Sequence, residues 1–327
     1  MQAAFYTRQG PAADVLTVGE QPTPQPGPGE VRVRLATSGV NPSDYKVRKG
    51  GFGRALAWPL VIPHSDGAGV IDAVGEGEPR ERIGERVWTW NGQWNRAGGT
   101  AAQFIALPSA QAVRHGTALD DAQAACVGIP VFTAWQAVHR ARLVPGSTVL
   151  VAGGAGSVGH YAVQLARRKG ATVLTTVSSD AKAEHARSAG ADHVIRYRDE
   201  DVGARVQALT GGRGVDAVIE MDFTANVRLY PACVRPGATV VVYGMGALEA
   251  PVPTFWFMRN RIRMDFLYVY EMDADEREEG LRELTALLDA GALRHSVALR
   301  LPLAEIARAH DIVEQGQVLG HVVLDIP

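Results

Sequence analysis

A glycine-rich turn between an apolar strand and an amphipathic helix constrains the fold of this 327-residue chain more than any other feature. The segment TVLVAG leads into GAGSVG, where Gly154, Gly156 and Gly159 satisfy the spacing G-x-G-x-x-G, and the helix HYAVQLARRKG follows. A second strand, ATVLTTV, completes a βαβ unit, the context in which such glycines let the backbone approach a pyrophosphate at a helix N-terminus. The pattern predicts a dinucleotide site that includes Ser157 and Val158; a turn needed only for packing is the alternative.

The end of the second strand distinguishes NAD from NADP. An NAD-binding unit usually carries Asp or Glu there, about 20 residues beyond the glycines, to bind the ribose 2′-hydroxyl. Ser178 and Ser179 occupy this place, and with Lys182 they suit a 2′-phosphate. Asp180 would restore the acidic signature, but we expect it to cap the next helix. Tyr197, after the third strand, is expected to cover the phosphate or to pack at the sheet edge. The cofactor expected is NADPH.

Two different patterns of predicted secondary structure indicate two domains. Short strand-like runs separated by Gly and Pro extend to about residue 120 and indicate a barrel or sandwich. From about residue 119 a helical segment, DDAQAACVGIPVFTAWQAVHRAR, leads into strands rich in Val, Ile and Leu that alternate with helices. This alternation is typical of a parallel sheet covered on both faces.

Composition excludes several classes of partner. The 33 Lys and Arg residues against 35 Asp and Glu residues give a net charge of −2, so nucleic acid and anionic membranes are not expected to bind. No run of about 18 apolar residues that would span a membrane occurs. The two cysteines, Cys126 and Cys233, cannot build a disulfide framework and fit a reducing compartment. We expect a cytoplasmic protein.

Several motifs in order carry a family resemblance over essentially the whole chain: SGVNPSDYKVRKG, PHSDGAGVIDAVGEG, GIPVFTAW, GGAGSVGHYAVQLA, GADHVIRYRDED and AHDIVEQGQVLGHVVLDIP. The chain resembles the medium-chain dehydrogenase/reductase superfamily, and within it the zinc-independent NADPH:quinone oxidoreductases related to zeta-crystallin. The resemblance implies an α/β fold with a GroES-like, partly open β-barrel catalytic domain, residues 1–121 completed by 266–327. A Rossmann NADP-binding domain with a doubly wound parallel sheet is implied for residues 122–265.

The resemblance also addresses metal binding. Zinc-dependent members take ligands at three positions that here are Asn41, Ser65 and Pro130. A catalytic zinc needs about three protein ligands, so His64 and Asp66 cannot suffice and no metal is expected. His64 is expected to be a turn residue or a wall of the cleft, and Asp66 to bond local backbone or a basic side chain.

The same resemblance places residues around the nicotinamide and the substrate. Asn41 is expected to bond the cofactor or a quinone oxygen, and Tyr45 to donate a proton or hydrogen bond to the reduced oxygen. Asp44 is expected to line the same catalytic pocket; that Asp44 only caps a turn and Tyr45 only packs is the alternative. The opposite wall is expected to contain Thr133, Gly244, Met245, Phe266 and Leu267.

These expectations lead to NADPH-dependent reduction of a small-molecule quinone by hydride transfer without zinc. An enoyl or alkenal double-bond reductase on the same scaffold is one alternative, with an enone as substrate. A non-catalytic NADPH-binding structural or RNA-binding protein is another, since zeta-crystallin relatives can have such roles. The β-rich run at residues 261–270 is expected to form the outermost strand of the sheet and to pair two chains as a homodimer.

Overall fold

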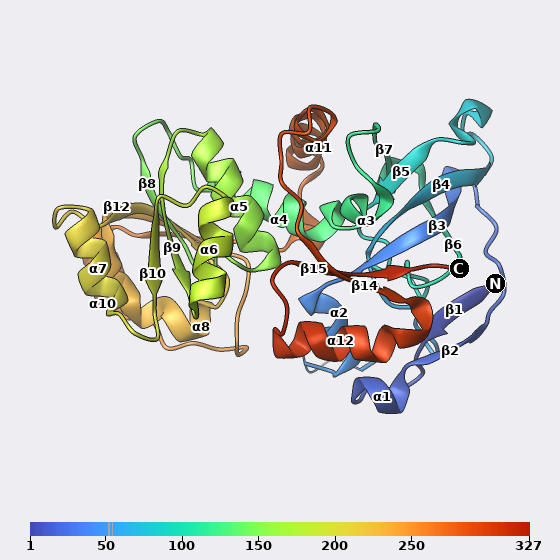
Figure 1. Ribbon diagram of the computed structural model, residues 1–327, viewed down its shortest axis with the longest axis horizontal. Coiled ribbons are helices and arrows are strands. Elements are labelled where there is room, and N and C mark those ends of the chain that lie inside the picture. Colours follow the sequence, from blue (N-terminus) through green and yellow to red (C-terminus); the bar gives the residue numbers. More distant parts are fainter. Residues whose placement is uncertain (52, 54) are drawn as a thin grey trace. The chain divides into compact units, whose positions relative to one another are not determined.

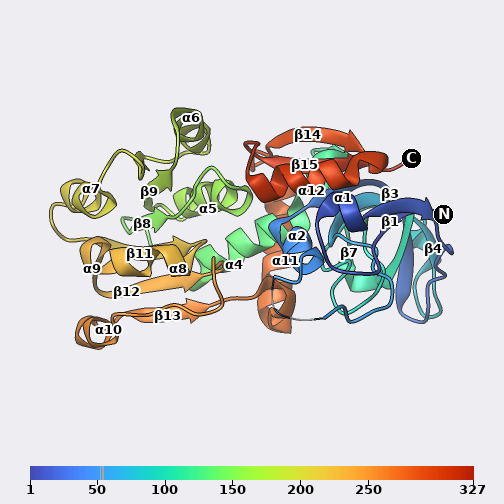
Figure 2. The same ribbon diagram turned by 90° about the horizontal axis from the view of Figure 1, so that it is seen from below.

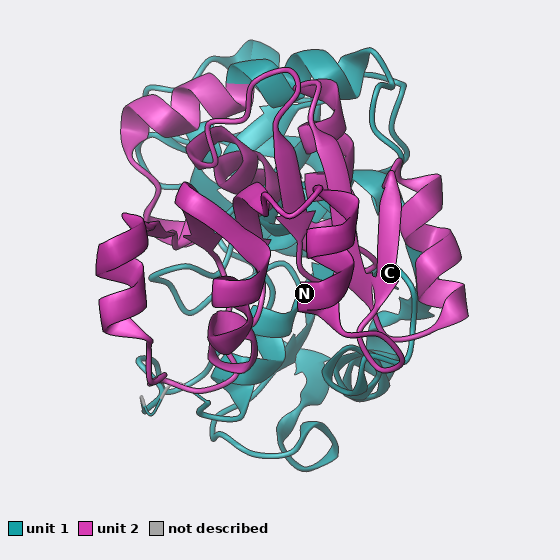
Figure 3. Ribbon diagram, turned by 90° about the vertical axis from the view of Figure 1, so that its left-hand side faces the viewer, with its two compact units in different colours: residues 1–130, 282–327 teal, residues 131–281 magenta. Residues whose placement is uncertain are grey.

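The computed structural model describes residues 1–51, 53 and 55–327. The chain forms two compact units, residues 1–130 with 282–327 and residues 131–281 (Figure 3). The sequence placed the divisions after residues 121 and 265. In the structure, α4 (Phe132–Arg140) packs against α5 (Ser157–Arg168) and therefore begins the second unit. The second division falls within α11 (Ala274–Asp289).

The second unit is built on a six-stranded sheet in the order β10-β9-β8-β11-β12-β13, in which all pairs are parallel. Numbered from β8, this is the order 3-2-1-4-5-6 of the Rossmann fold. The strands are β8 (Thr148–Val151), β9 (Thr172–Val177), β10 (His193–Arg196), β11 (Val215–Glu220), β12 (Val234–Val242) and β13 (Arg263–Phe266). Figure 2 shows β13 at the outer edge of the sheet, next to α10 (Thr254–Asn260).

Helices cover both faces of this sheet, which explains its continuous apolar strands. Figure 1 shows α5 and α6 (Asp180–Ser188) on one side and α7 (Val202–Leu209) and α10 on the other. Short helices, α8 (Phe223–Asn226) and α9 (Tyr230–Cys233), link β11 to β12. Leu174, Ile195, Val218 and Val240 are almost fully buried in the core between these layers.

The first unit is mainly antiparallel. Its larger sheet runs β14-β15-β3-β4-β5-β7, with β6 also paired to β3, and a two-stranded sheet joins β1 and β2. The strands are β1 (Gln2–Phe5), β2 (Thr17–Glu20), β3 (Glu30–Val40), β4 (Asp66–Val74), β5 (Arg86–Thr89), β6 (Phe104–Pro108), β7 (Ala112–Arg114), β14 (Val297–Pro302) and β15 (His321–Asp325). Because β15 pairs with β3, the two ends of the chain share one sheet. The α/β fold with a GroES-like barrel and a Rossmann sheet is thus confirmed.

Helices of the first unit are α1 (Ala12–Val15), α2 (Pro42–Arg48), α3 (Asp121–Ala124) and α12 (Ile306–Gln315). Helix α2 begins where Asn41 caps it and Pro42 takes the first helical position, which needs no backbone N–H. Helix α12 packs against α2 and β15. Among the described residues, no helix combines the length and apolarity needed to cross a membrane.

The predicted helical segment after residue 120 is interrupted. Helix α3 ends at Ala124, a π-helical turn covers Val127–Val131, and α4 follows. Pro130 lies inside this turn and has no N–H to donate to the α-helical hydrogen-bond pattern.

Candidate functional site

The glycine turn between β8 and α5 is tightly closed by hydrogen bonds. The amide of Gly154 donates to Thr175 Oγ1 at 2.9 Å, and Gly156 N donates to Gly153 O at 2.9 Å. A Cβ on Gly159 would lie 2.2 Å from Gly153 O, so no larger residue fits there without a backbone shift. Gly156 caps α5 and has no side chain to accept from the first turn, which leaves the helix N-terminus suited to an anion.

The parallel register brings the predicted cofactor residues of the second unit to the side of the sheet where the strands have their carboxyl ends, because parallel strands end there together. Val151 pairs with Thr175 and Arg196 with Val177, so the glycine turn, Ser178 and Tyr197 follow neighbouring strands. The amide of Tyr197 donates to Val177 O at 3.1 Å.

The remaining strands extend the same edge. Val242 pairs with Phe266, the amide of Leu267 donates to Val242 O at 2.9 Å, and Gly244 O accepts from Phe223 N at 3.1 Å. Met245, the residue after Gly244, is partly exposed. Thr133 lies on α4, where it is buried, and strand pairing does not place it at this edge.

The region predicted for the 2′-phosphate differs from expectation in one respect. The cap of α6 is Ser179, whose hydroxyl accepts from Lys182 N at 3.4 Å, so the prediction that Asp180 caps the helix was wrong. Asp180 instead accepts a hydrogen bond from Arg196 Nη1 at 2.7 Å. Sequence reasoning missed Arg196; the available signal was a cation at the end of the third strand, directly before Tyr197.

The predicted catalytic residues of the first unit lie at the start of α2. The backbone amide of Asn41 donates to Asp44 Oδ2 at 2.7 Å, and its side-chain amide donates to Asp66 Oδ2 at 2.8 Å. Asp66 was expected to bond local backbone or a basic side chain; its carboxylate accepts from the Asn41 side chain and from the backbone of Ile129, which is distant in sequence. Asp44 has the capping role of the alternative interpretation. Tyr45 is half-buried.

Burial controls the protonation of these groups. It raises the pKa of Asp66 to about 7 and holds the pKa of Asp44 well above its usual range. It also raises the pKa of the Tyr45 hydroxyl, so this group is a neutral donor at neutral pH. The carboxyl of Asp66 therefore titrates where a proton can be gained or lost under ordinary conditions.

His64 occupies an uncommon conformation next to Asp66. Its φ is 75°, a left-handed value that costs a non-glycine residue about 1–2 kcal/mol. Its ring is fully buried, with Nδ1 2.9 Å from Ser38 Oγ and Nε2 2.9 Å from His310 Nε2. Burial lowers the pKa of His64 to about 3. His64 thus lies in a loop with a left-handed backbone conformation and has a specific pair of ring contacts; its place in a cleft wall stays a prediction.

The donor set does not suit zinc. Asn41 offers an amide already bonded to Asp66, Pro130 offers no side-chain donor atom, and both ring nitrogens of His64 lie within hydrogen-bond distance of protein partners. Within the described part of the chain, no three His, Cys, Asp or Glu side chains gather as a metal site. The residues present therefore do not provide the ligands that catalytic zinc requires.

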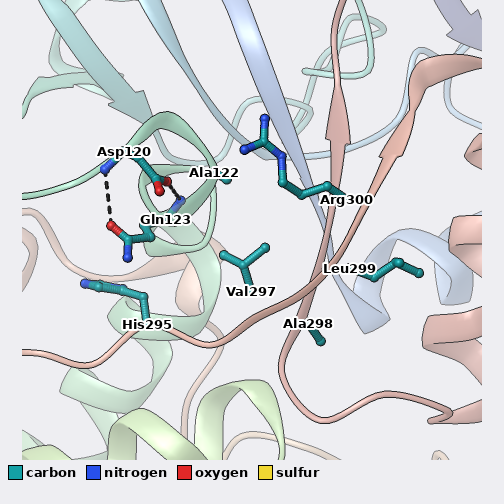
Figure 4. Close-up of a pocket in the computed structure, with 8 residues that line it drawn as sticks. All are labelled: Asp120, Ala122, Gln123, His295, Val297, Ala298, Leu299 and Arg300. Atoms are coloured by element: carbon teal, nitrogen blue, oxygen red, sulfur yellow. Dashed lines mark hydrogen bonds between the residues drawn. The ribbon is translucent and has the colours of Figure 1, made fainter.

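A separate pocket lies in the first unit between α3 and β14 (Figure 4). Its volume is about 460 Å³, and Figure 4 shows Asp120 and Gln123 bonded to each other on one side. Burial lowers the pKa of His295 on its wall to about 4. Its described lining contains no residue predicted to bind substrate or cofactor. The lining residues are Asp120, Ala122, Gln123, His295, Val297, Ala298, Leu299 and Arg300.

A GroES-like unit combined with a 3-2-1-4-5-6 sheet and its glycine turn defines a two-domain, nucleotide-dependent class of enzyme. Residues 27–117 match the family described as alcohol dehydrogenase GroES-like domain, and residues 157–286 match the family described as zinc-binding dehydrogenase. The latter range contains none of the three ligand positions discussed above.

Known proteins resemble the chain over its full length. It is 32% identical to the 2-haloacrylate reductase of Burkholderia sp, over 99% of this chain and 98% of that protein. It is 30% identical to the quinone oxidoreductase of Rattus norvegicus, over 92% and 90%. A mycobacterial protein whose structure was solved in complex with NADPH has a TM-score of 0.89 and 28% identity, over 99% and 100%.

The chain belongs to the medium-chain dehydrogenase/reductase superfamily, as its motifs predicted, and it is an oxidoreductase.

Proposed function

We propose that this protein is an NADPH-dependent quinone reductase that works without zinc. The observation that carries the proposal is the glycine turn, closed so tightly that a Cβ at Gly159 would meet Gly153 O at 2.2 Å, at the bare N-terminus of α5. The first-turn amides of α5 would hold the pyrophosphate, and Ser178, Lys182 and Arg196 would hold the 2′-phosphate. Bound NADPH supplies a hydride.

The first unit supplies groups that orient the substrate and provide a proton. Asn41, fixed by Asp66 and Asp44, would bond the oxygen of a quinone. Tyr45 would donate its hydroxyl proton in a hydrogen bond to the oxygen that gains charge. Because the donor set does not suit zinc, we expect acceptors that are electron-poor without a Lewis acid, which favours quinones over simple carbonyl compounds.

An alkene reductase is the second candidate, and one observation favours it: the 2-haloacrylate reductase is the relative with 32% identity over almost the whole chain. An alkene conjugated to a carboxylate or carbonyl accepts hydride at carbon, and the negative charge then develops on oxygen. The same donors, Asn41 and Tyr45, would therefore serve both reactions.

A steady-state panel separates these candidates. NADPH consumption is measured with quinones, enones and 2-haloacrylate, and the Gly159→Ala variant serves as the cofactor-site control. We expect a higher kcat/KM for quinones than for the alkenes. The reverse order would favour the alkene reductase, and no consumption above the Gly159→Ala rate with any acceptor would reject both activities.

We also propose a homodimer formed through the edge of the Rossmann sheet. Strand β13 is the last strand on that side, and apolar side chains beside it are exposed: Phe255 by 77%, Met258 by 72% and Phe266 by 61%. An apolar edge strand favours pairing with a second copy across a two-fold axis. The two free, buried cysteines, Cys126 and Cys233, fit our proposal of a cytoplasmic location.

A further inference from the structure

A line of buried polar side chains crosses the first unit from α2, through α12, to the start of β4. It consists of residues from α2, α12, β3 and two loops, each with none of its surface exposed: Arg48, His310, His64, Ser38 and Thr100. Successive members lie within hydrogen-bond distance, and the last reaches the backbone of Asp66. Buried polar groups almost always have hydrogen-bond partners, so each contact in this line needs one donor and one acceptor, and this requirement fixes which atom donates.

The Asp66 end fixes the direction of half of the line. A backbone carbonyl only accepts, so Thr100 Oγ1 donates to Asp66 O at 2.6 Å. Thr100 Oγ1 must then accept from Ser38 Oγ, 2.8 Å away, because its own proton is already used. Ser38 Oγ in turn accepts from His64, whose Nδ1 lies 2.9 Å away and therefore carries hydrogen.

The Arg48 end fixes the other half independently. A guanidinium only donates, so His310 Nδ1 accepts from Arg48 Nε at 3.3 Å. The hydrogen of a neutral His310 is then on Nε2, which faces His64 Nε2 at 2.9 Å. The two assignments agree at the contact between the rings. A neutral His64 with hydrogen on Nδ1 has a lone pair on Nε2, which accepts the hydrogen bond from His310 Nε2. Both histidines are neutral, and each has one defined tautomer.

This line joins two parts of the proposed catalytic region. At one end it holds the backbone of Asp66, whose carboxylate binds the amide of Asn41. At the other end it holds Arg48, which is on the same helix as Asp44 and Tyr45. Arg48, the last residue of α2, also donates to Glu314 Oε2 of α12 at 3.0 Å and to Gly10 O. Its guanidinium therefore connects the end of α2 to α12 and to the N-terminal segment.

We propose that His64 and His310 are positioning residues for the reductase reaction, which orient Asn41 and Tyr45 by linking the start of β4 to α2. The inference rests on the proposed function for the chemistry served, and on the hydrogen-bond directions for the linkage itself. It also accounts for a histidine at a position with φ of 75°, where glycine would be free of strain. The imidazole is needed there because one neutral ring both donates and accepts.

Nitrogen NMR of the wild-type protein labelled at histidine tests the directions without any variant. We expect His64 to carry hydrogen on Nδ1 and His310 on Nε2, both neutral at neutral pH. Finding either ring charged, or His64 with hydrogen on Nε2, would overturn the linkage.

Variants test the consequence for catalysis. His310→Leu leaves Arg48 Nε and His64 Nε2 without partners, whereas His310→Gln retains one acceptor and one donor and is expected to rescue. His115→Leu, another buried histidine of the same unit outside the line, is the matched control. We expect His310→Leu to lower kcat at least about tenfold, as misplaced catalytic groups do. NADPH affinity is expected to be unchanged, and hydrogen exchange of the α2 amides to increase.

The outcomes separate this inference from the proposed function. A wild-type protein that reduces no quinone or alkene contradicts the proposed function, while exchange in α2 still tests the linkage. Unchanged exchange in α2, or a kcat no lower than that of His115→Leu, rejects the positioning role. If His310→Leu does not fold, His64→Gly provides the same test, because glycine accepts the backbone conformation.

Discussion

Arg196→Ala is expected to weaken binding of NADPH and to leave binding of NADH almost unchanged. In the structure the guanidinium of Arg196 is bonded to Asp180 at 2.7 Å, beside the strand end where a 2′-phosphate is expected. Arg196 also pairs with Asp199, with its Nε 3.4 Å from Asp199 Oδ2, so binding of the phosphate would require it to exchange a carboxylate partner for a phosphate oxygen. Removing Arg196 also leaves the charge of Asp180 free to repel the phosphate.

The exposure of the ion pair sets the magnitude. The side chain of Asp180 is 86% exposed and that of Arg196 is 40% exposed. Such a pair contributes only about 0–1 kcal/mol, so little is lost when it opens. A hydrogen bond to a charged phosphate contributes about 1.5–3 kcal/mol. The net effect of about 0.5–3 kcal/mol corresponds to roughly 2- to 150-fold in Kd, with roughly tenfold as the central expectation.

Fluorescence titration of the protein with each cofactor measures this effect without turnover. Lys182→Ala is expected to act in the same direction as Arg196→Ala, and Asp180→Asn is expected to tighten NADPH because it removes a like charge. Arg198→Ala, which removes an exposed cation two residues away, is the control. Equal weakening of NADPH and NADH by Arg196→Ala would refute the assignment of this region to the 2′-phosphate.

Three further predictions concern metal, assembly and pH. Protein purified without added zinc is expected to contain well under one equivalent by metal analysis, and stoichiometric zinc whose chelation abolishes activity would contradict the donor-set argument. Light scattering is expected to give twice the chain mass for the wild type and the chain mass for Phe255→Glu, with the exposed Val144→Glu as control; a monomeric wild type would exclude the dimer. Because burial lowers the pKa of His64 to about 3, stability from the neutral ring is complete above the unfolded pKa near 6.5 and is lost as pH falls toward 3. We therefore expect the difference in free energy of unfolding between wild type and His64→Gly, measured with urea, to shrink as pH falls below about 6.5, by up to about 1.4 kcal/mol per pH unit. A difference that stays constant with pH would show that His64 does not titrate as stated.

Local patterns explain how much of the fold was visible in the sequence. Alternating and continuous apolar runs depend on which faces of a strand are buried, and these runs located β3 and the strands from β8 to β12. The glycine spacing located the turn before α5, because a backbone that passes within 2.2 Å of a would-be Cβ at Gly159 admits no other residue. The break at Pro130 was missed because the apolar pattern continues through this residue. The α-helical hydrogen bonding does not continue, since proline has no backbone N–H.

The sequence by itself indicated two domains and the nucleotide turn, since both depend on residue types at short spacing, and the family resemblance implied the loss of the zinc ligands. Only the tertiary structure decided the partners of the polar side chains. Arg196 meets Asp180 because β10 pairs with β9, and Asn41 meets Asp66 because β3 pairs with β4. His64 meets His310 across 246 residues of chain because the C-terminal strand β15 returns to β3 and carries α12 with it. Periodicity reports which residues are buried, but a buried polar residue is stabilised by one particular partner, and packing at long sequence separation selects that partner.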